Sequence, residues 1–177
     1  MTTWSSSLLT CVEKHLHEKP FWERGYKSLG AAKKNQRSIH LAVFVEPFLK
    51  FLLDGRKTVE SRFSIHRMAP FGCVHSGDLV LIKASGGPVV AMAEVSHVWY
   101  YQLDAPAWDV IRNRFGEQLC VEDPAFWKSK ESSCFATLMQ FAKVDKIEPL
   151  NCSKRDRRGW VVLGGPQRQP SLFSPEE

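Results

Sequence analysis

The sequence predicts an α+β fold that is mainly β, with a small, closed β-barrel of about six strands and flanking helices. Short apolar segments rich in β-branched and aromatic residues recur along the chain, separated by turns that contain Gly or Pro. One short helical pattern follows the first of these segments, and a longer helical stretch interrupts them late in the chain. With 177 residues, of which 44% are hydrophobic and 24% charged, the chain has enough apolar surface to fold without a metal or disulfides.

The first half of the predicted barrel begins with a strand over residues 40–45, which is almost entirely apolar. Pro47 is typical of a helix start and Gly55 of a helix end, so a short helix is predicted over 48–53. Residues 58–63 form the next predicted strand. The chain therefore begins its main domain as strand, helix and strand in succession.

The second half contributes four more strands and two helices. Turns at 76–78 and 86–88 each precede an apolar segment rich in β-branched or aromatic residues. Aspartates shortly before prolines, at 104–106 and 123–124, are typical of helix starts. The predicted strands are 79–84, 89–101, 136–147 and 159–163, and the predicted helices are 104–114 and 123–130.

Three regions are predicted along the chain. Residues 1–37 form a helical and basic appendage, with one helix over 5–17 and aromatic side chains that are available to pack on the main domain. Residues 38–164 form the β-rich domain, and residues 165–177 form a C-terminal tail.

The positive charge of the chain is concentrated near its ends. The formal net charge is +5. Residues 1–37 carry seven Lys and Arg against three Asp and Glu, and residues 150–170 carry five against one. Such a distribution favours a polyanionic partner, because cations that neutralise phosphates release counterions. The alternative is a basic surface that only keeps the protein soluble.

Cysteine usage and hydropathy exclude several classes. The cysteines are five, scattered and never spaced as Cys-x-x-Cys, which predicts free thiols, no metal site and no cofactor. The longest apolar run, residues 41–45, is far shorter than the roughly 20 residues of a membrane-spanning helix, so no membrane association is predicted. Residues 1–10 carry no charge and no continuous apolar stretch, which predicts a cytoplasmic protein without a secretory signal.

One motif concentrates charge at a single place. Gly55-x-Lys57-x-x-Glu60-x-Arg62 begins after the first helix and runs into the next strand. In an extended strand Thr58, Glu60 and Arg62 point to one face, and Lys57 stands at the start of the strand. Two cations beside an acid can hold a phosphate while the carboxylate accepts from an exocyclic amino group. The alternative is an ion pair of Glu60 with Arg62 or Lys57 that plugs the barrel mouth.

This motif, together with the order of the strands, resembles the ASCH domain family of the PUA-like superfamily. The resemblance covers residues 38–164 and implies a PUA-like β-barrel with a cleft between barrel and helices that takes RNA or modified nucleotides. The supporting residues are Glu46-Pro47, Gly77-Asp78, Ser85-Gly86-Gly87-Pro88-Val89 and Glu94-Val95.

Further residues are expected to line this cleft. Lys83 and Ser85 share one strand face, as do Trp99 and Tyr101, whose rings are suited to stacking on bases or to packing in the core. A basic loop directly before Trp160 is suited to phosphate contacts or is a solvated surface. The predicted nucleic-acid-binding residues are Lys57, Thr58, Glu60, Arg62, Lys83, Ser85, Trp99, Tyr101, Lys154, Arg155, Arg157, Arg158 and Trp160.

The leading functional hypothesis is a module that binds single-stranded RNA, or one modified nucleotide, in the basic cleft beside the motif, with RNA processing or DNA binding as extensions. One alternative is a small hydrolase, a ribonuclease or an N4-acylcytidine amidohydrolase, with Lys57 and Glu60 as catalytic residues. The amidohydrolase branch of the resemblance implies a lysine-activated threonine, but Glu60 stands at the threonine position. A third hypothesis is a protein-interaction domain of a transcription or translation complex that uses residues 1–37.

Overall fold

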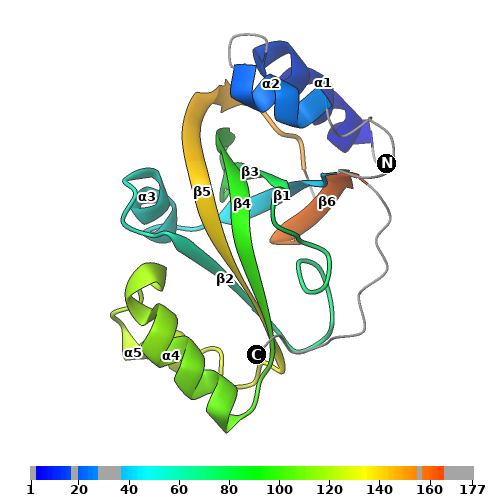
Figure 1. Cartoon of the computed structure of the whole chain (residues 1–177). Helices are drawn as coiled ribbons and strands as arrows, with labels where there is room; N and C mark the ends of the chain where they lie inside the picture. Colours follow the sequence, from blue (N-terminus) through cyan, green and yellow to red (C-terminus); the bar gives the residue numbers. More distant parts are fainter. Residues whose placement is uncertain (1–2, 17–19, 28–36, 155–156, 166–177) are drawn as a thin grey trace.

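The computed structural model describes residues 3–16, 20–27, 37–154 and 157–165 (Figure 1). None of the helices in these ranges is long and apolar enough to cross a membrane. The helices are α1 (Thr3–Leu16), α2 (Pro20–Lys27), α3 (Phe48–Leu53), α4 (Ala105–Leu119) and α5 (Pro124–Lys128). The strands are β1 (Ile39–Phe44), β2 (Val59–Ser64), β3 (Leu79–Ala84), β4 (Val89–Gln102), β5 (Phe135–Leu150) and β6 (Trp160–Gly164).

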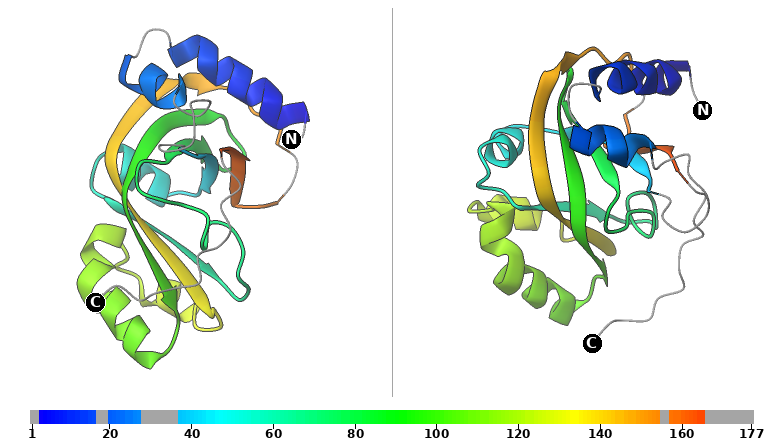
Figure 2. Two further views of the ribbon diagram at one scale, coloured as in Figure 1. Left: turned by 45° about the vertical axis from the view of Figure 1, so that its right-hand side comes forward. Right: turned by 45° about the horizontal axis from the view of Figure 1, so that its top comes forward.

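The strands form one six-stranded mixed sheet in the order β2-β5-β4-β3-β1-β6. Only β1 and β3 are parallel, and the other neighbours are antiparallel. The long strands β4 and β5 pass through several register shifts, and the sheet curls into a half-barrel (Figures 1 and 2). The predicted mainly β fold of about six strands with flanking helices is confirmed, but the half-barrel is not closed: in the described part of the chain, β2 and β6 are its two unpaired edges.

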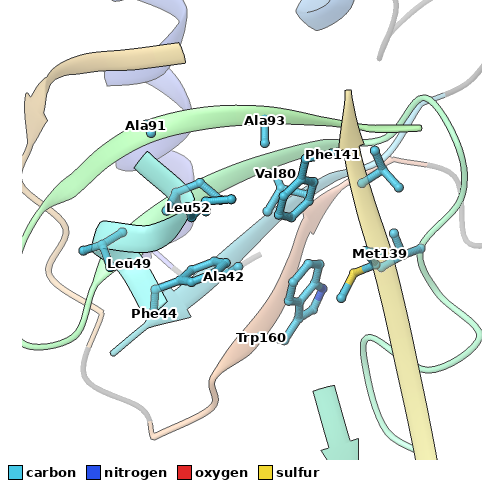
Figure 3. Close-up of a cluster of buried hydrophobic side chains, with 13 residues drawn as sticks. Ala42, Phe44, Leu49, Leu52, Val80, Ala91, Ala93, Met139, Phe141 and Trp160 are labelled. Carbon is cyan, nitrogen blue, oxygen red and sulfur yellow. The ribbon is translucent and has the colours of Figure 1, made fainter. Parts of the chain in front are cut away.

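The sheet is buried where the sequence is most apolar. Every residue of β3 from Leu79 to Lys83 is buried, which explains a continuous apolar run rather than an alternating one. Inside the curl, one buried cluster joins the sheet to α3 (Figure 3). Its labelled members are Ala42, Phe44, Leu49, Leu52, Val80, Ala91, Ala93, Met139, Phe141 and Trp160.

Helices α1 and α2 cover one end of the half-barrel, opposite α4 and α5 (Figure 2). Leu8, Val12 and Trp22 are buried in the same cluster as core residues of β1, β3 and β6. The indole Nε1 of Trp22 donates to Oδ2 of Asp145 on β5 at 2.6 Å. The predicted helix over 5–17 corresponds to α1, which begins two residues earlier at Thr3, and residue 17 lies outside the described residues. Helix α2 was not predicted from the sequence. The N-terminal region therefore contributes to the core.

Helix α4 has the predicted beginning but extends five residues further. Asp104 caps it by accepting a hydrogen bond from the amide of Ala107 at 2.8 Å. The helix continues past the predicted end at residue 114 to Leu119. It ends at Cys120, which has a φ of 54° in the left-handed region that normally favours glycine.

This helix end predicts a stabilising substitution. We expect Cys120→Gly to raise the free energy of unfolding by about 1 kcal/mol. A side chain in the left-handed region costs roughly 1–2 kcal/mol, and the larger backbone entropy that glycine loses on folding offsets part of the gain from removing it. Urea unfolding measures the change. Cys120→Ala is the matched control, since it removes the thiol but keeps the strained Cβ. If Cys120→Gly is no more stable than Cys120→Ala, the interpretation of this cap is wrong.

Candidate functional site

A cavity of about 500 Å³ lies in the gap between the two edges of the half-barrel. β2 forms one side, and the end of β1 together with Gly159, which precedes β6, forms the other. Helices α3 and α5 supply the remaining walls. The cavity is lined by Val43, Phe44, Val45, Phe48, Lys57, Glu60, Ser61, Arg62, Phe63, Ser85, Phe126, Lys130, Arg157 and Gly159.

Three charged side chains of the motif meet inside this cavity. Glu60 is 6% exposed and lies between two cations: its Oε2 is 3.4 Å from Nζ of Lys57, and its Oε1 is 2.8 Å from Nε of Arg62. Lys57 is only 3% exposed. Both ion pairs that the sequence offered as alternatives are therefore present at once, in a triad of which Lys57 and Glu60 are buried and Arg62 is partly exposed.

Arg62 bridges the gap in the half-barrel. Its guanidinium donates from Nη2 to the carbonyl of Val43 at 2.9 Å and from Nη1 to the carbonyl of Gly159 at 3.3 Å. The Nε contact with Glu60 is an ion pair, because its N–H is not aligned with the carboxylate. A Cβ on residue 159 would lie 3.1 Å from Nη1, so glycine leaves room for this bridge.

The turn after α3 and the end of α4 together position Lys57. Gly55 has a φ of 76° and ends α3, so that the chain turns at once into β2. The ammonium of Lys57 then donates to the carbonyl of Leu119, the last residue of α4, at 3.1 Å. The neighbouring amide of Thr58 donates to the carbonyl of Gln118 at 3.1 Å. Two carbonyls at the C-terminal end of α4 thus fix the start of β2.

Aromatic rings form the apolar wall of the cavity. Phe126 on α5 lies 5.7 Å from Phe48 and 6.1 Å from Phe63, measured between ring centroids. Phe63 in turn stacks on Trp108 of α4 at 5.4 Å with an interplanar angle of 8°, which holds the helical layer against β2. This wall was not predicted from the sequence.

Two cations line the cavity beside this wall. Lys130, just after α5, has its Nζ 5.6 Å from the Phe126 ring, and Arg157 is an exposed residue of the predicted basic loop. Only the helical spacing of Phe126 and Lys130, four residues apart, could have pointed to the Lys130 position.

Five of the predicted nucleic-acid-binding residues line this cavity, namely Lys57, Glu60, Arg62, Ser85 and Arg157. Arg155 lies outside the described residues. The remaining predicted residues do not line it, although they are described: Thr58, Lys83, Trp99, Tyr101, Lys154, Arg158 and Trp160.

Thr58, Lys83 and Trp160 are engaged elsewhere. Thr58 is exposed and lies one residue before β2 begins. It therefore does not share a strand face with Glu60, contrary to the expectation from the sequence. Lys83 is 7% exposed because its ammonium donates to the carbonyls of Ala84 and Gly87 in the adjacent turn. Trp160 is 4% exposed in the core, although its ring lies 5.6 Å from the guanidinium carbon of Arg62.

Trp99 and Tyr101 share one face, as expected, but that face packs against α4. The Trp99 ring lies 4.8 Å from Phe115, and both residues belong to the cluster beneath this helix. Burial raises the pKa of the Tyr101 phenol, and the nearby Arg114 opposes this shift. Packing in the core, the alternative role for these rings, agrees with the structure.

A metal or thiol chemistry has no support in the described residues. No group of three or more His, Cys, Asp or Glu side chains gathers there. Burial raises the pKa of the Cys73 thiol, which disfavours the reactive thiolate at neutral pH. The polar and aromatic groups that the cavity lining offers are the ion triad, the phenylalanine rings and the outer cations.

The curled half-barrel is similar in fold to a solved ASCH protein, as the motif predicted. The chain is similar to the crystal structure of ASCH from Zymomonas mobilis, with a TM-score of 0.52 and 19% sequence identity over 64% of this chain and 73% of that one. A variant of the same Zymomonas protein gives a TM-score of 0.53 at 19% identity, covering 65% and 75%. At this identity the likeness is one of fold. No family model and no curated protein matches the sequence.

Proposed function

We propose that the cavity in the gap of the half-barrel binds one unpaired nucleotide of a single-stranded RNA. The observation that carries this proposal is the Lys57–Glu60–Arg62 triad, with Lys57 and Glu60 buried, in a cavity walled by phenylalanines. The volume, about 500 Å³, falls in the range of small-molecule and nucleotide sites. The ASCH and PUA-like fold, which the resemblance associates with nucleic acids, agrees with this kind of ligand.

Energetics favour a binding role over a structural role for the triad. Removal of ions from water costs several kcal/mol per ion, so a buried ion pair adds little to stability compared with apolar residues of the same size. The same pair offers a fixed charge pattern to a ligand that enters the cavity. A base against the Phe48, Phe63 and Phe126 walls gains stacking energy of about 1–3 kcal/mol.

The direct test is the fluorescence anisotropy of an end-labelled single-stranded RNA titrated with the protein. A saturable rise supports the proposal, and the absence of a rise at micromolar protein rejects it. A DNA strand of the same sequence, measured in parallel, shows whether the 2′-hydroxyl contributes.

Time courses of the same titration test the hydrolase alternative. Lys57 and Glu60, its two catalytic candidates, are in contact in the cavity, with 3.4 Å between Nζ and Oε2. Ribonuclease activity would make the anisotropy fall below that of free RNA. Thr58, the threonine within the motif, is not in the cavity lining.

The two cations beside the aromatic wall, Lys130 and Arg157, predict how the RNA affinity depends on salt concentration. We expect Lys130→Ala and Arg157→Ala each to reduce the slope of log affinity against log salt by about 0.7, because each cation would neutralise one phosphate of a single strand. Lys128→Ala is the matched control, since Lys128 lies on α5 and is exposed but does not line the cavity. Equal slopes for the Lys130 and Lys128 variants would remove Lys130 from the phosphate contacts.

A further inference from the structure

Four consecutive residues of β2, from Glu60 to Phe63, line the cavity. A strand that presents only one face to a cavity contributes every second residue, because successive side chains point to opposite faces. Consecutive lining residues mean that the cavity also contacts the edge of the strand. β2 is an edge strand of the sheet, so its main chain borders the cavity as well as its side chains.

The hydrogen bonds to β5 show which main-chain groups face the cavity. In an antiparallel pair only every second residue directs its N–H and C=O toward the partner strand. The amide of Phe141 on β5 donates to the carbonyl of Thr58 at 3.2 Å, and the amide of Cys134 donates to the carbonyl of Ser64 at 2.9 Å. The even-numbered residues of this segment therefore face β5. The main-chain groups of Ser61 and Phe63 point the other way, toward the gap.

These outward groups are open in the described part of the chain. None of its hydrogen bonds outside the strand ladders uses the N–H or C=O of Ser61 or Phe63. Arg62 spans the gap, but its guanidinium binds the carbonyls of Val43 and Gly159 on the far side. The carbonyls of Val43 and Gly159 on the far side therefore have a hydrogen-bond partner. On the β2 side, Ser61 and Phe63 each keep one main-chain donor and one acceptor for a ligand.

We infer that the open main-chain edge of β2, at Ser61 and Phe63, hydrogen-bonds the Watson–Crick edge of the base that enters the cavity. This inference rests on the proposed function and specifies how the nucleotide is recognised. The N–H and C=O of one residue in an extended strand lie side by side. Each standard base likewise has a donor next to an acceptor on its Watson–Crick edge. A main-chain pair can therefore bind any base, but only one that is not already base-paired.

An added peptide strand is the other ligand that an open edge accepts. The surroundings favour a base. Arg62 crosses the gap and divides it, whereas strand addition needs a continuous edge, and the adjacent walls carry charges and phenylalanine rings suited to a nucleotide. The expected specificity is for single-stranded RNA with an unmodified Watson–Crick edge, and substitution at other ring positions is tolerated.

Methylated RNAs test this inference without changing the protein. The probe is whichever of the four homopolymeric RNAs binds most tightly, compared with the same RNA methylated at the Watson–Crick ring nitrogen (N1 of purines, N3 of pyrimidines). We expect the methyl group to weaken binding at least about tenfold, since at least one hydrogen bond is lost and a buried group is left unpaired. A methyl group on the opposite edge of the base, such as C5 of a pyrimidine, is the control and should change affinity less than about twofold.

A protein variant tests the same contact from the other side. Ser61→Pro removes the outward N–H, and proline is tolerated where an edge N–H does not serve the ladder. We expect binding to be at least about tenfold weaker for Ser61→Pro than for Ser61→Ala, which changes the same side chain but keeps the N–H. If Ser61→Pro does not fold, the methylated RNAs still test whether the β2 edge contacts the Watson–Crick edge of the base.

The outcomes separate the two levels of the proposal. Binding of unmodified RNA that is unaffected by the Watson–Crick methyl group overturns the inference and leaves the proposed function intact, with the β2 edge then open to an extended peptide. Absence of binding by all four homopolymers overturns the proposed function, and the inference with it.

Discussion

Asp78→Ala is expected to lower the free energy of unfolding by about 3–5 kcal/mol, because it leaves several buried donors without their charged acceptor. Asp78 is fully buried at the start of β3. Its Oδ1 accepts from the amide of Ser38 at 2.7 Å, and its Oδ2 accepts from the amide of His75 at 2.8 Å and from Nε2 of His40 at 3.2 Å. One carboxylate thus links the residue before β1 (Ser38), a residue within β1 (His40) and the turn before β3 (His75).

The protonation state of His40 follows from its neighbours. Nδ1 of His40 lies 3.2 Å from the indole Nε1 of Trp160, which is only a donor, so Nδ1 must accept. The proton is then on Nε2 and is donated to Asp78. With Nδ1 accepting from Trp160 and Nε2 donating to Asp78, all three buried side chains have a partner, and loss of the carboxylate leaves Nε2 of His40 without its acceptor.

Urea unfolding of three proteins measures this effect. Asp54→Ala is the control, because Asp54 is exposed and forms only a surface ion pair with Lys50 on α3. Asp78→Asn is a milder variant that keeps one acceptor oxygen but places an NH₂ group against a donor. We expect the order of stability wild type, Asp54→Ala, Asp78→Asn, Asp78→Ala, with the first two nearly equal. Equal midpoints for the Asp54 and Asp78 alanine variants would contradict the assigned network.

The same network reaches the cavity. Trp160 contacts His40 on one side, with ring centroids 5.5 Å apart, and the guanidinium carbon of Arg62 on the other at 5.6 Å. Trp160 does not line the cavity, yet it supports the bridge that Arg62 makes across the gap. In the structure Trp160 therefore touches the cavity only through Arg62.

The strands were the most predictable part of the fold. All six follow from apolar segments between glycine, proline and aspartate turns, within a few residues at each end. Helix α2 was missed because it has only eight residues, with Gly25 among them. The end of α4 was placed too early because Gly116 lies inside the helix, whereas the left-handed residue that ends it is Cys120.

The charged centre of the site was predictable, and its surroundings were not. Lys57, Glu60 and Arg62 lie close together in sequence, so strand geometry alone brings two of them to one face. The phenylalanine wall and Lys130 come from elements that are distant in sequence, and only the curl of the sheet brings α5 to β2. For Lys83 the strand was predicted correctly, but the expected place in the cavity lining was not. Its ammonium donates to carbonyls of the neighbouring turn instead.

The triad predicts a reversal that distinguishes binding from stability. We expect Glu60→Leu alone to lower the free energy of unfolding by about 3–5 kcal/mol, because Lys57 then stays buried without a countercharge. The double variant Lys57→Met with Glu60→Leu should recover most of this loss, since well-packed apolar residues replace the buried Lys57–Glu60 pair at little or no cost. Arg62 also loses Glu60, but it is partly exposed and keeps its hydrogen bonds to the carbonyls of Val43 and Gly159. Urea unfolding of the wild type, both single variants and the double variant gives the coupling energy of the pair.

RNA binding should not recover with stability. The double variant folds but presents methyl and thioether groups where the wild type presents a carboxylate between two cations. Its affinity for RNA should therefore remain at least about tenfold weaker than that of the wild type, because one or more charge-assisted hydrogen bonds to the ligand are lost. A double variant that is stable and binds RNA normally would show that the triad is only a plug of the half-barrel. A double variant as unstable as Glu60→Leu would show instead that the ion pair itself holds β2 in place. Only recovered stability with lost binding assigns the triad to the ligand.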